Sequence, residues 1–510
     1  MPNSNLAGWV ADRALADPYA PAIKQGETIL SYAALDGAAS RFATLLAGRG
    51  VGRGDRVALI MPNVAYFPIA YYAILRLGAV VVPMNPLLKA REVAFTWADC
   101  GVTLAVVFPL FVEEATKAAA GTGTEVLVTV PKEFEHTLTE TEPTDEVVAV
   151  DPDDTAVILY TSGTTGQPKG AELSHANLRS NAVTTVETLM PNGPGDVIFG
   201  GLPLFHSFGQ TCALNAAMAG GACLTLLPKF DPEEALRVIS EDRVTIFLGV
   251  PTMYSALLGV KDAQRYDTST VKVAASGGAS LPVEVLRGVE RTFGFPLLEG
   301  YGLSETAPVA SFNHPDRPTK PGSVGTPIRG VEFALHHPPV EDGERSAATA
   351  LGTEEVGDGE IGEIVIRGEN VMKGYWGRPE ETAEALRGGW FHTGDLATRD
   401  ADGYYFIVDR VKDMIIRNGF NVYPREVEEV LYAHPAVAEA AVLGVPDPEH
   451  GEEVAAMVTL KDGASATAQE LQDYVADQIA VYKYPRIIRF GVLPKGPTGK
   501  ILKREITIER

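Results

Sequence analysis

The chain has 510 residues, enough for one large domain with a small one or for three domains of ordinary size. Hydrophobic residues make up 45% of it and the formal net charge is -23, which indicates a globular protein and argues against general binding to nucleic acid or anionic lipid. Its three cysteines, Cys100, Cys212 and Cys223, lack metal or redox spacing, so we expect no disulfide framework and a cytoplasmic location.

Apolar runs typical of strands alternate with helical patterns from the N-terminus onward. Arg56–Met61 reads as a strand, and the apolar stretch Ala65–Met84 reads as a buried helix, a turn at Gly78 and a strand over Ala79–Val82. That stretch is too short and too interrupted to span a bilayer, and the N-terminus has no secretory signal, so we expect no transmembrane segment. Buried strands separated by helices favour parallel sheets in an α/β fold. Further strands are expected at Thr155–Leu159, Val197–Phe199, Ala222–Leu227, Val244–Leu248 and Val271–Ala275.

The pattern changes near residue 355. Glu363–Arg367 and Gly403–Val408 read as strands in a more antiparallel setting, and a charged stretch at 409–412 follows them. We therefore predict a large N-terminal domain over 1–408, with parallel-rich sheets flanked by helices plus a β-subdomain, a hinge over 409–412 and a small α+β domain over 413–510. The elements expected in the small domain are helices at Pro424–Ala433 and Ala468–Ala480 and strands at Val437–Val445 and Glu453–Leu460.

The segment from Tyr160 to Gly170 directly follows the expected strand Thr155–Leu159. It holds four Ser or Thr hydroxyls, three glycines and Lys169, all groups that suit a phosphate-binding loop. It is not a Walker A loop, because only two residues separate Gly163 from Gly166 and a proline precedes the lysine. The alternative, a flexible surface turn, does not explain why so many phosphate-binding groups follow a buried strand.

With this loop the chain resembles the adenylate-forming enzymes, which include acyl-CoA synthetases, adenylation domains of peptide synthetases and firefly luciferase. Motif order matches roughly from Ala22 to Arg504, and the likeness is greatest to bacterial fatty acid–CoA ligases and 4-coumarate–CoA ligases. The resemblance implies that the loop holds the β- and γ-phosphates of ATP. The loop residues that it assigns to ATP are Thr161, Ser162, Gly163, Thr164, Thr165, Gly166 and Lys169.

Three further motifs match the family: Ser276–Ser280, Glu299–Thr306 and Trp390–Asp395, the last followed by Asp409-Arg410. The resemblance implies that they bind the nucleotide and that Glu305 coordinates Mg²⁺, a cation that prefers carboxylate and phosphate oxygens. Without the motifs, there would be strong alternatives: Ser276–Ser280 could be a structural glycine turn, and Glu305 could be an ordinary surface carboxylate. The nucleotide-binding residues implied are Gly278, Ala279, Glu299, Gly300, Tyr301, Gly302, Ser304, Asp395 and Arg410.

The C-terminal stretch from Lys483 is basic, and by charge alone it could be a solvated tail or a segment that closes over phosphate. Its Pro497–Lys500 motif resembles the one whose lysine bridges the carboxylate and the α-phosphate during adenylation. The resemblance also implies a hinge at Lys412 and a CoA-facing loop at Asn418 and Gly419, where many relatives have a different pair. The residues expected to be catalytic are Lys500, His206, Glu305 and Thr161.

The motif Pro203–Gly209 resembles the one that lines the acyl pocket. His206 could act as a base, orient the carboxylate, gate the pocket or be a satisfied core histidine. No Asp lies near His206, and no arginine or tryptophan falls in the pocket motifs, which favours a medium- or long-chain fatty acid over an amino acid, a dicarboxylate or acetate; an aryl acid is the alternative. The acyl-binding residues implied are His206, Phe208, Cys212, Gly277, Ala279, Gly302, Pro308 and Val309.

The sequence thus predicts an acid–CoA ligase that uses ATP, CoA and a carboxylic acid, with Mg²⁺ as cofactor. Three alternatives share the same fold: an adenylation enzyme that loads a carrier protein, a luciferase-like oxygenase and a non-catalytic binding protein. The sequence leaves both a monomer and a homodimer open.

Overall fold

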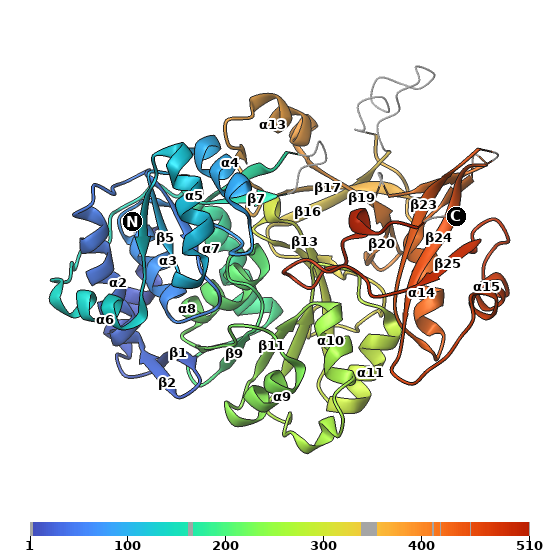
Figure 1. Ribbon diagram of the computed structural model, residues 1–510, viewed down its shortest axis with the longest axis horizontal. Coiled ribbons are helices and arrows are strands. Elements are labelled where there is room, and N and C mark those ends of the chain that lie inside the picture. Colours follow the sequence, from blue (N-terminus) through green and yellow to red (C-terminus); the bar gives the residue numbers. More distant parts are fainter. Residues whose placement is uncertain are drawn as a thin grey trace.

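The computed structural model describes residues 4–161, 167–337, 354–410, 413–418, 420–448 and 450–508. Several predicted site residues lie outside the described residues, namely Ser162, Gly163, Thr164, Thr165, Gly166, Lys412 and Gly419. Figure 1 shows the N-terminal part of the chain on one side of the molecule and the last hundred residues, in orange and red, on the other. The α/β fold class predicted from the sequence is confirmed.

The first large sheet has the strand order β18-β8-β7-β4-β3-β5-β6. Its centre is parallel, because the Val-rich strands of this region are buried on both faces. The antiparallel strand β8 turns back beside β7, so Thr161 and Lys169 face each other across the base of the predicted phosphate loop. The strands are β3 (Arg56–Ile60), β4 (Val80–Pro83), β5 (Leu104–Val107), β6 (Glu125–Val128), β7 (Thr155–Thr161), β8 (Lys169–Ser174) and β18 (Gly374–Tyr375).

The second large sheet has the order β15-β14-β13-β12-β11-β9-β10-β1-β2. Its strands β10, β9, β11, β12 and β13 run parallel, as predicted, and the predicted strand bounds are met to within two residues. The strands are β1 (Pro21–Gln25), β2 (Thr28–Ser31), β9 (Val197–Gly200), β10 (Cys223–Leu226), β11 (Ile246–Gly249), β12 (Val273–Ser276), β13 (Leu297–Gly302), β14 (Val309–Phe312) and β15 (Thr326–Pro327).

A third sheet, of order β16-β17-β19-β20, is antiparallel throughout and forms the β-subdomain that the sequence predicted. Asp409 and Arg410 are its last residues and pair with β19, so this sheet extends two residues past the predicted boundary at 408. The hinge itself stays a prediction. The strands are β16 (Val331–His336), β17 (Gly362–Gly368), β19 (Phe391–Arg399) and β20 (Tyr405–Arg410).

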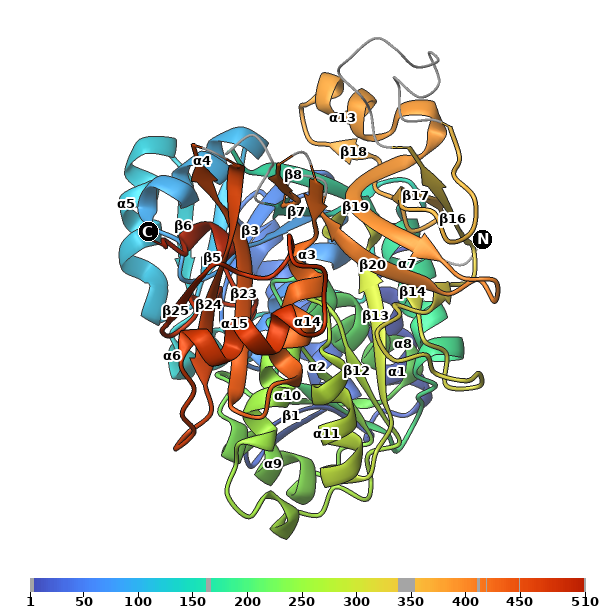
Figure 2. The ribbon, with the colours of Figure 1, turned by 90° about the vertical axis from the view of Figure 1, so that its right-hand side faces the viewer.

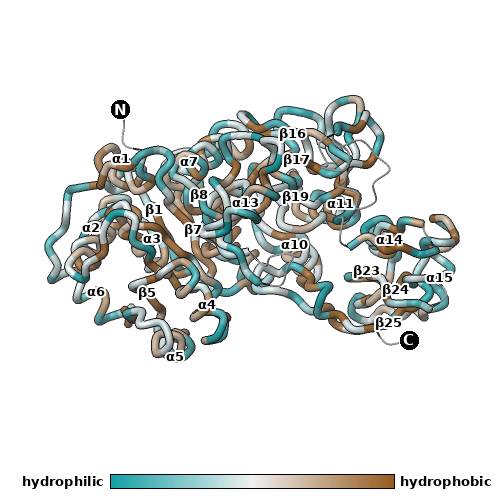
Figure 3. The backbone as a smooth tube through the Cα atoms, turned by 90° about the horizontal axis from the view of Figure 1, so that it is seen from above, coloured by the Kyte–Doolittle hydropathy of each residue, from teal (hydrophilic) through white to brown (hydrophobic). Residues whose placement is uncertain are grey.

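The helices of this larger part cover the sheets, and in Figure 3 the brown, hydrophobic stretches of chain include strands enclosed by these helices. They are α1 (Gly8–Ala16), α2 (Tyr32–Ala47), α3 (Tyr66–Arg76), α4 (Ala90–Cys100), α5 (Val112–Thr122), α6 (Pro131–Glu140), α7 (His175–Thr184), α8 (Ala216–Gly220), α9 (Pro232–Glu241), α10 (Pro251–Leu258), α11 (Val283–Phe293) and α13 (Pro379–Ala385). Within the described ranges, no helix combines the length and the apolar character that crossing a membrane requires.

The residues from 413 onward form a small unit with its own sheet, seen to one side in Figure 3. Helices α14 and α15 lie in front of this sheet in Figure 2. Side chains alternate along its strands: Val442 packs under the helices, whereas Ala441 faces the C-terminal segment that carries Ile506. The elements are β21 (Ile415–Arg417), β22 (Phe420–Val422), α14 (Pro424–Ala433), β23 (Val437–Asp447), β24 (Gly451–Leu460), α15 (Ala468–Ala476) and β25 (Ile487–Phe490).

One boundary in the small unit was predicted wrongly. The second helix was expected to reach Ala480, but α15 ends at Ala476 and Asp477 is its C-cap. An acidic residue at the negative end of a helix is unfavourable. Beyond it the chain turns, and Ile479 and Tyr482 pack against the core of the small unit instead of continuing the helix.

Candidate active site

A cavity of about 750 Å³ opens where the ends of the two large sheets, the β-subdomain and the C-terminal segment meet. It collects residues from motifs that are more than 300 positions apart in the sequence. The predicted site residues that line it are Thr161, Lys169, His206, Phe208, Cys212, Gly277, Gly278, Gly300, Tyr301, Gly302, Ser304, Glu305, Pro308, Val309, Arg410 and Lys500.

One end of the cavity combines hydroxyl, carboxylate and ammonium groups. The Thr161 hydroxyl lies 3.4 Å from Oε1 of Glu305, and the Tyr375 hydroxyl donates to the same oxygen at 3.0 Å. The Lys169 ammonium lies 5.3 Å from the centre of the Tyr375 ring. Because Thr161 and Lys169 pair across the base of the predicted phosphate loop, the structure brings the base of that loop to Glu305.

Glu305 is buried, and burial raises the pKa of its carboxyl; the hydroxyls of Tyr375 and Thr161 act in the opposite direction. The side chain extends from a short helical turn directly after β13. Its neighbour strands approach closely, since a side chain at Gly302 would meet the Pro308 carbonyl oxygen at 1.9 Å. A buried carboxylate with two hydroxyl neighbours is the chemistry that accepts a cation.

A second polar group lies at the end of the β-subdomain. Tyr301 donates its phenol proton to Asp395 Oδ2 at 2.6 Å, and Arg410 Nε donates to the other carboxylate oxygen at 3.0 Å. Asp395 is buried, and its charge raises the pKa of Arg410. Asp395 does not line the cavity itself but holds the two residues that do. Three hydrogen-bonding side chains thus converge at this edge of the cavity.

The remaining wall is apolar. Leu189 ends a π-helical turn over Thr185–Leu189 and Met190 is its C-cap, and Cys212 comes from a second π-helix over Gly209–Asn215. Such turns widen a helix locally and are frequent at functional sites. The side chains of this wall expose almost no surface: Leu189 0%, Met190 1%, Leu202 2% and Cys212 1%.

Lys500 and His206 both line the cavity, and Lys500 is close enough to act on the charge of His206. Burial and, to a lesser extent, the nearby positive charge of Lys500 together lower the pKa of His206 to about 4. His206 Nδ1 accepts the backbone N–H of Phe208 at 3.4 Å. The imidazole is therefore neutral at pH 7. The C-terminal segment reaches the cavity, and its closure over phosphate stays a prediction.

Besides Asp395, three described residues of the predicted site do not line the cavity. Unlike Asp395, they make no evident contact that holds a lining residue in place. The Glu299 carboxylate is 2% exposed and accepts the backbone N–H of Leu281; burial raises its pKa to about 7. Its side chain is therefore directed at Leu281, and its contact with a nucleotide stays a prediction. Ala279 and Asn418 also lie outside the lining.

Several lining residues were missed by the sequence reasoning. Tyr375 is the most important, because it connects Lys169 with Glu305. Its only sequence signal is a Gly-Tyr-Trp run in a polar stretch. Leu189, Met190 and Val250 also line the cavity, and nothing local in the sequence separates them from ordinary core residues.

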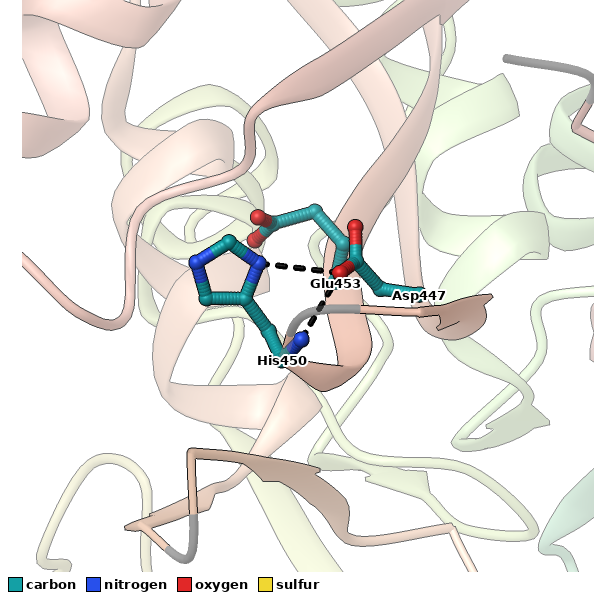
Figure 4. Close-up of side chains that lie close together, drawn as sticks. All are labelled: Asp447, His450 and Glu453. Carbon is teal, nitrogen blue, oxygen red and sulfur yellow. Dashed lines mark hydrogen bonds and ion pairs between the residues drawn. The ribbon is translucent and has the colours of Figure 1, made fainter.

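A cluster of possible metal ligands in the small unit is better explained by the hydrogen bonds and ion pairs that its side chains already make. Asp447, His450 and Glu453 place ligand atoms within 4.8 Å of one another (Figure 4). However, Arg417 already binds both oxygens of Glu453, at 2.6 and 2.9 Å, and His450 Nδ1 pairs with Asp447 at 2.9 Å. The turn carrying His450 accepts the backbone N–H of Asn418 at 2.8 Å, so the cluster supports the predicted CoA-facing loop.

The chain was compared with known proteins. The family model described as AMP-binding enzyme matches residues 10–376, and that of the AMP-binding enzyme C-terminal domain matches residues 426–500. The chain belongs to the AMP-binding enzyme family. The prediction from the motifs, an AMP-forming acid–CoA ligase of the adenylate-forming superfamily, is thereby confirmed.

Relatives of this AMP-binding enzyme carry different substrate names. A long-chain-fatty-acid–CoA ligase of Bacillus subtilis is 37% identical, with 100% of this chain and 95% of the relative covered. A feruloyl-CoA synthase of Amycolatopsis is 40% identical, with 99% of both covered. The crystal structure of ATP-bound MatB from Rhodopseudomonas palustris superposes with a TM-score of 0.89 at 34% identity, covering 98% of each chain.

Proposed function

We propose that this enzyme activates a monocarboxylic acid with an apolar tail of medium length, first as an acyl-adenylate and then as a CoA thioester. The observation that carries the proposal is one cavity lined by Lys500 and His206, by the polar groups around Glu305, and by the buried apolar side chains of Leu189, Met190 and Cys212. The carboxylate of the acid needs a nearby cation, which Lys500 supplies, and its apolar tail needs a site without water, which the apolar wall supplies.

In the first half-reaction a carboxylate oxygen attacks the α-phosphorus of ATP, the bond to the bridging oxygen breaks, and pyrophosphate leaves. We expect Lys169 and Thr161 to hold the departing phosphates. Lys500 supplies the positive charge between two anions that would otherwise repel each other. Tyr301, Arg410 and the Asp395 that joins them would bind the ribose and adenine end.

Mg²⁺ fits the polar end of the cavity. The Glu305 carboxylate and the Thr161 hydroxyl are hard oxygen donors 3.4 Å apart, and burial disfavours the charge on Glu305 unless a cation balances it. We expect these two residues to hold the ion together with phosphate oxygens. Bound there, the ion would neutralise phosphate charge that develops during adenylation.

In the second half-reaction the CoA thiol attacks the acyl carbon, loses its proton, and AMP leaves. We infer that the small unit rotates about 409–412 between the two steps. The arrangement described here suits the first step, because Lys500 lines the cavity whereas Asn418, on the predicted CoA-facing loop, does not. Domain rotation about a short connection is a common way to exchange catalytic groups.

His206 is better suited to orienting the carboxylate than to acting as a base. Its pKa of about 4 leaves it neutral and weakly basic at pH 7. A neutral imidazole can still donate one hydrogen bond to a carboxylate oxygen. We therefore expect His206 to hold the acid in place beside Lys500.

The apolar wall of the cavity limits the length of the acyl tail that the enzyme can bind. One cavity of about 750 Å³ must hold both the nucleotide and the acyl group, and Leu189, Met190 and Cys212 close its far side with almost no exposed surface. This favours a medium-chain fatty acid over one of palmitate length. A cinnamate-like aryl acid is the second candidate, favoured by the 40% identity to a feruloyl-CoA synthase.

The test is product detection by mass spectrometry with ATP, Mg²⁺, CoA and a panel of acids from acetate to palmitate plus benzoate and cinnamates. We expect AMP and acyl-CoA together, with the highest rate for octanoate or decanoate. A highest rate for ferulate would select the aryl candidate. AMP without any acyl-CoA would point to a carrier protein as acceptor, and no AMP with any acid would contradict the proposal.

A further inference from the structure

A single side-chain hydrogen bond joins helix α10 of the large domain to the turn that carries Lys500. Thr252 Oγ1 donates to the carbonyl oxygen of Gly499 at 2.9 Å, across 247 positions of sequence. Figure 1 shows the C-terminal segment, in red, extending from the small unit back towards the centre of the molecule above α10. The contact is half-buried and lies at the edge of the cavity, where Val250 and Thr498 are lining residues.

The turn that Thr252 contacts is tight and specific. The N–H of Gly499 donates to the Gly496 carbonyl at 2.9 Å, and the N–H of Gly496 donates to the Lys500 carbonyl at 2.8 Å. Gly499 has φ +80°, a conformation that other residues rarely adopt. A Cβ at this position would also meet Thr252 Oγ1 at 2.8 Å and Val250 Cγ2 at 3.0 Å. The turn therefore fits closely against α10 only with glycine at 499.

We propose that Thr252 is a positioning residue that docks this turn, and with it Lys500, for the adenylation half-reaction only. The proposal rests on the proposed function of the site. Thr252 has no evident contact with the reacting groups, so its effect must pass through the turn. The second half-reaction proceeds after the small unit has moved, when the bond between Thr252 and Gly499 no longer exists.

The hydrogen bond between Thr252 and Gly499 is weak enough for the turn to bind α10 reversibly. A neutral hydrogen bond at the margin of an interface contributes modestly, so its loss should slow adenylation by roughly 2- to 12-fold. A much stronger contact would hold the small unit in place and slow the rotation that the second step needs. The contact is thus expected to favour one of two arrangements without locking it.

The experiment compares Thr252→Val, Thr252→Ser and, as a matched control, Thr270→Val. Thr270 is a half-buried threonine of the same domain whose hydroxyl donates to the Val244 carbonyl at 2.8 Å, remote from the small unit. Adenylation is measured as pyrophosphate release in a single turnover with decanoate and with ferulate. Thioester formation is measured separately, from synthetic decanoyl- or feruloyl-adenylate and CoA. Thermal unfolding midpoints check that each variant folds.

We expect Thr252→Val to slow adenylation 2- to 12-fold, to leave thioester formation unchanged, and to be rescued by Thr252→Ser, which keeps the hydroxyl. Thr270→Val should leave both half-reactions at the wild-type rate. Equal loss of both half-reactions in Thr252→Val, or no loss in either, would overturn the proposal. If the wild-type enzyme produced no adenylate with either acid, the proposed substrate class would fail instead, so the two failures are distinguishable.

Discussion

Replacing Lys500 with alanine separates the two half-reactions most sharply. In the present arrangement Lys500 lies in the cavity close enough to His206 to lower the pKa of the imidazole. A unit charge about 4 Å from a phosphate contributes about 4 kcal/mol at an effective dielectric constant of about 20. Losing that interaction in the transition state corresponds to a decrease of about a thousandfold in the adenylation rate.

The assay measures each half-reaction by itself. Pyrophosphate release with the best acid of the panel reports adenylation, and acyl-CoA formed from synthetic acyl-adenylate reports the second step. Lys500→Ala should lose the first and largely retain the second. The matched control is Lys495→Ala, in the same basic segment but paired with Glu439 at 2.6 Å and not among the residues that line the cavity, which should retain both. An equal loss of both half-reactions in Lys500→Ala would refute the role assigned to Lys500.

Three further predictions follow from other parts of the cavity and the core. Asp395→Asn should slow both half-reactions by roughly tenfold to a hundredfold, because the charge-assisted contacts with Tyr301 and Arg410 hold the nucleotide end throughout, and a loss confined to one step would contradict this. Met190→Ala should shift the preferred fatty acid towards longer chains in the mass-spectrometric panel, and an unchanged preference would mean that Met190 does not limit the tail. Burial lowers the pKa of His175 to about 4, so between pH 6.5 and 4 the unfolded chain binds a proton that the folded chain does not, and by pH 5 about 2 kcal/mol of stability is lost. His175→Gln should therefore flatten the decrease of the thermal unfolding midpoint from pH 7 to pH 5, whereas the same change at the exposed His136 should not; an unchanged slope would contradict the burial argument.

Local patterns in the sequence were enough to predict most elements of the fold. The strand over Val80–Pro83 was visible because it is a run of buried valines after a glycine turn, and α14 was predicted with the bounds it has, Pro424–Ala433. The exception, the end of α15, is set by tertiary packing: Ile479 and Tyr482 gain more by packing on the core of the small unit than by continuing a helix.

The predicted site residues were found for a different reason, namely that they belong to compact motifs. Positions that act through long-range contacts were not visible. Thr252 reaches Gly499 across 247 positions, and Tyr375 reaches Glu305 across 70. Neither residue differs locally from many other threonines and tyrosines in the chain. The same limit applies to Glu299, since its motif gave no sign that its carboxylate accepts the backbone N–H of Leu281.

The way in which the small unit contacts the large domain supports rotation independently of any resemblance. Among the described residues, the buried apolar clusters of the small unit contain only residues from Ile415 onward, and those of the large domain contain none of them. Hydrogen bonds join the two, and one of them runs from the Arg425 backbone N–H to Asp409 Oδ2 at 3.0 Å. Arg425 donates to Ile407 at 2.7 Å and to Gly322 at 3.4 Å, and Thr252 donates to Gly499.

Such hydrogen bonds can be exchanged for bonds to water at small net cost, whereas separating two halves of a shared apolar core would expose surface at about 25 cal/mol per Å². An interface of this composition therefore permits repeated opening during turnover. The tight glycine turn around Gly499 then becomes necessary, because Lys500 must return to the same position each time with only a few weak contacts to guide it.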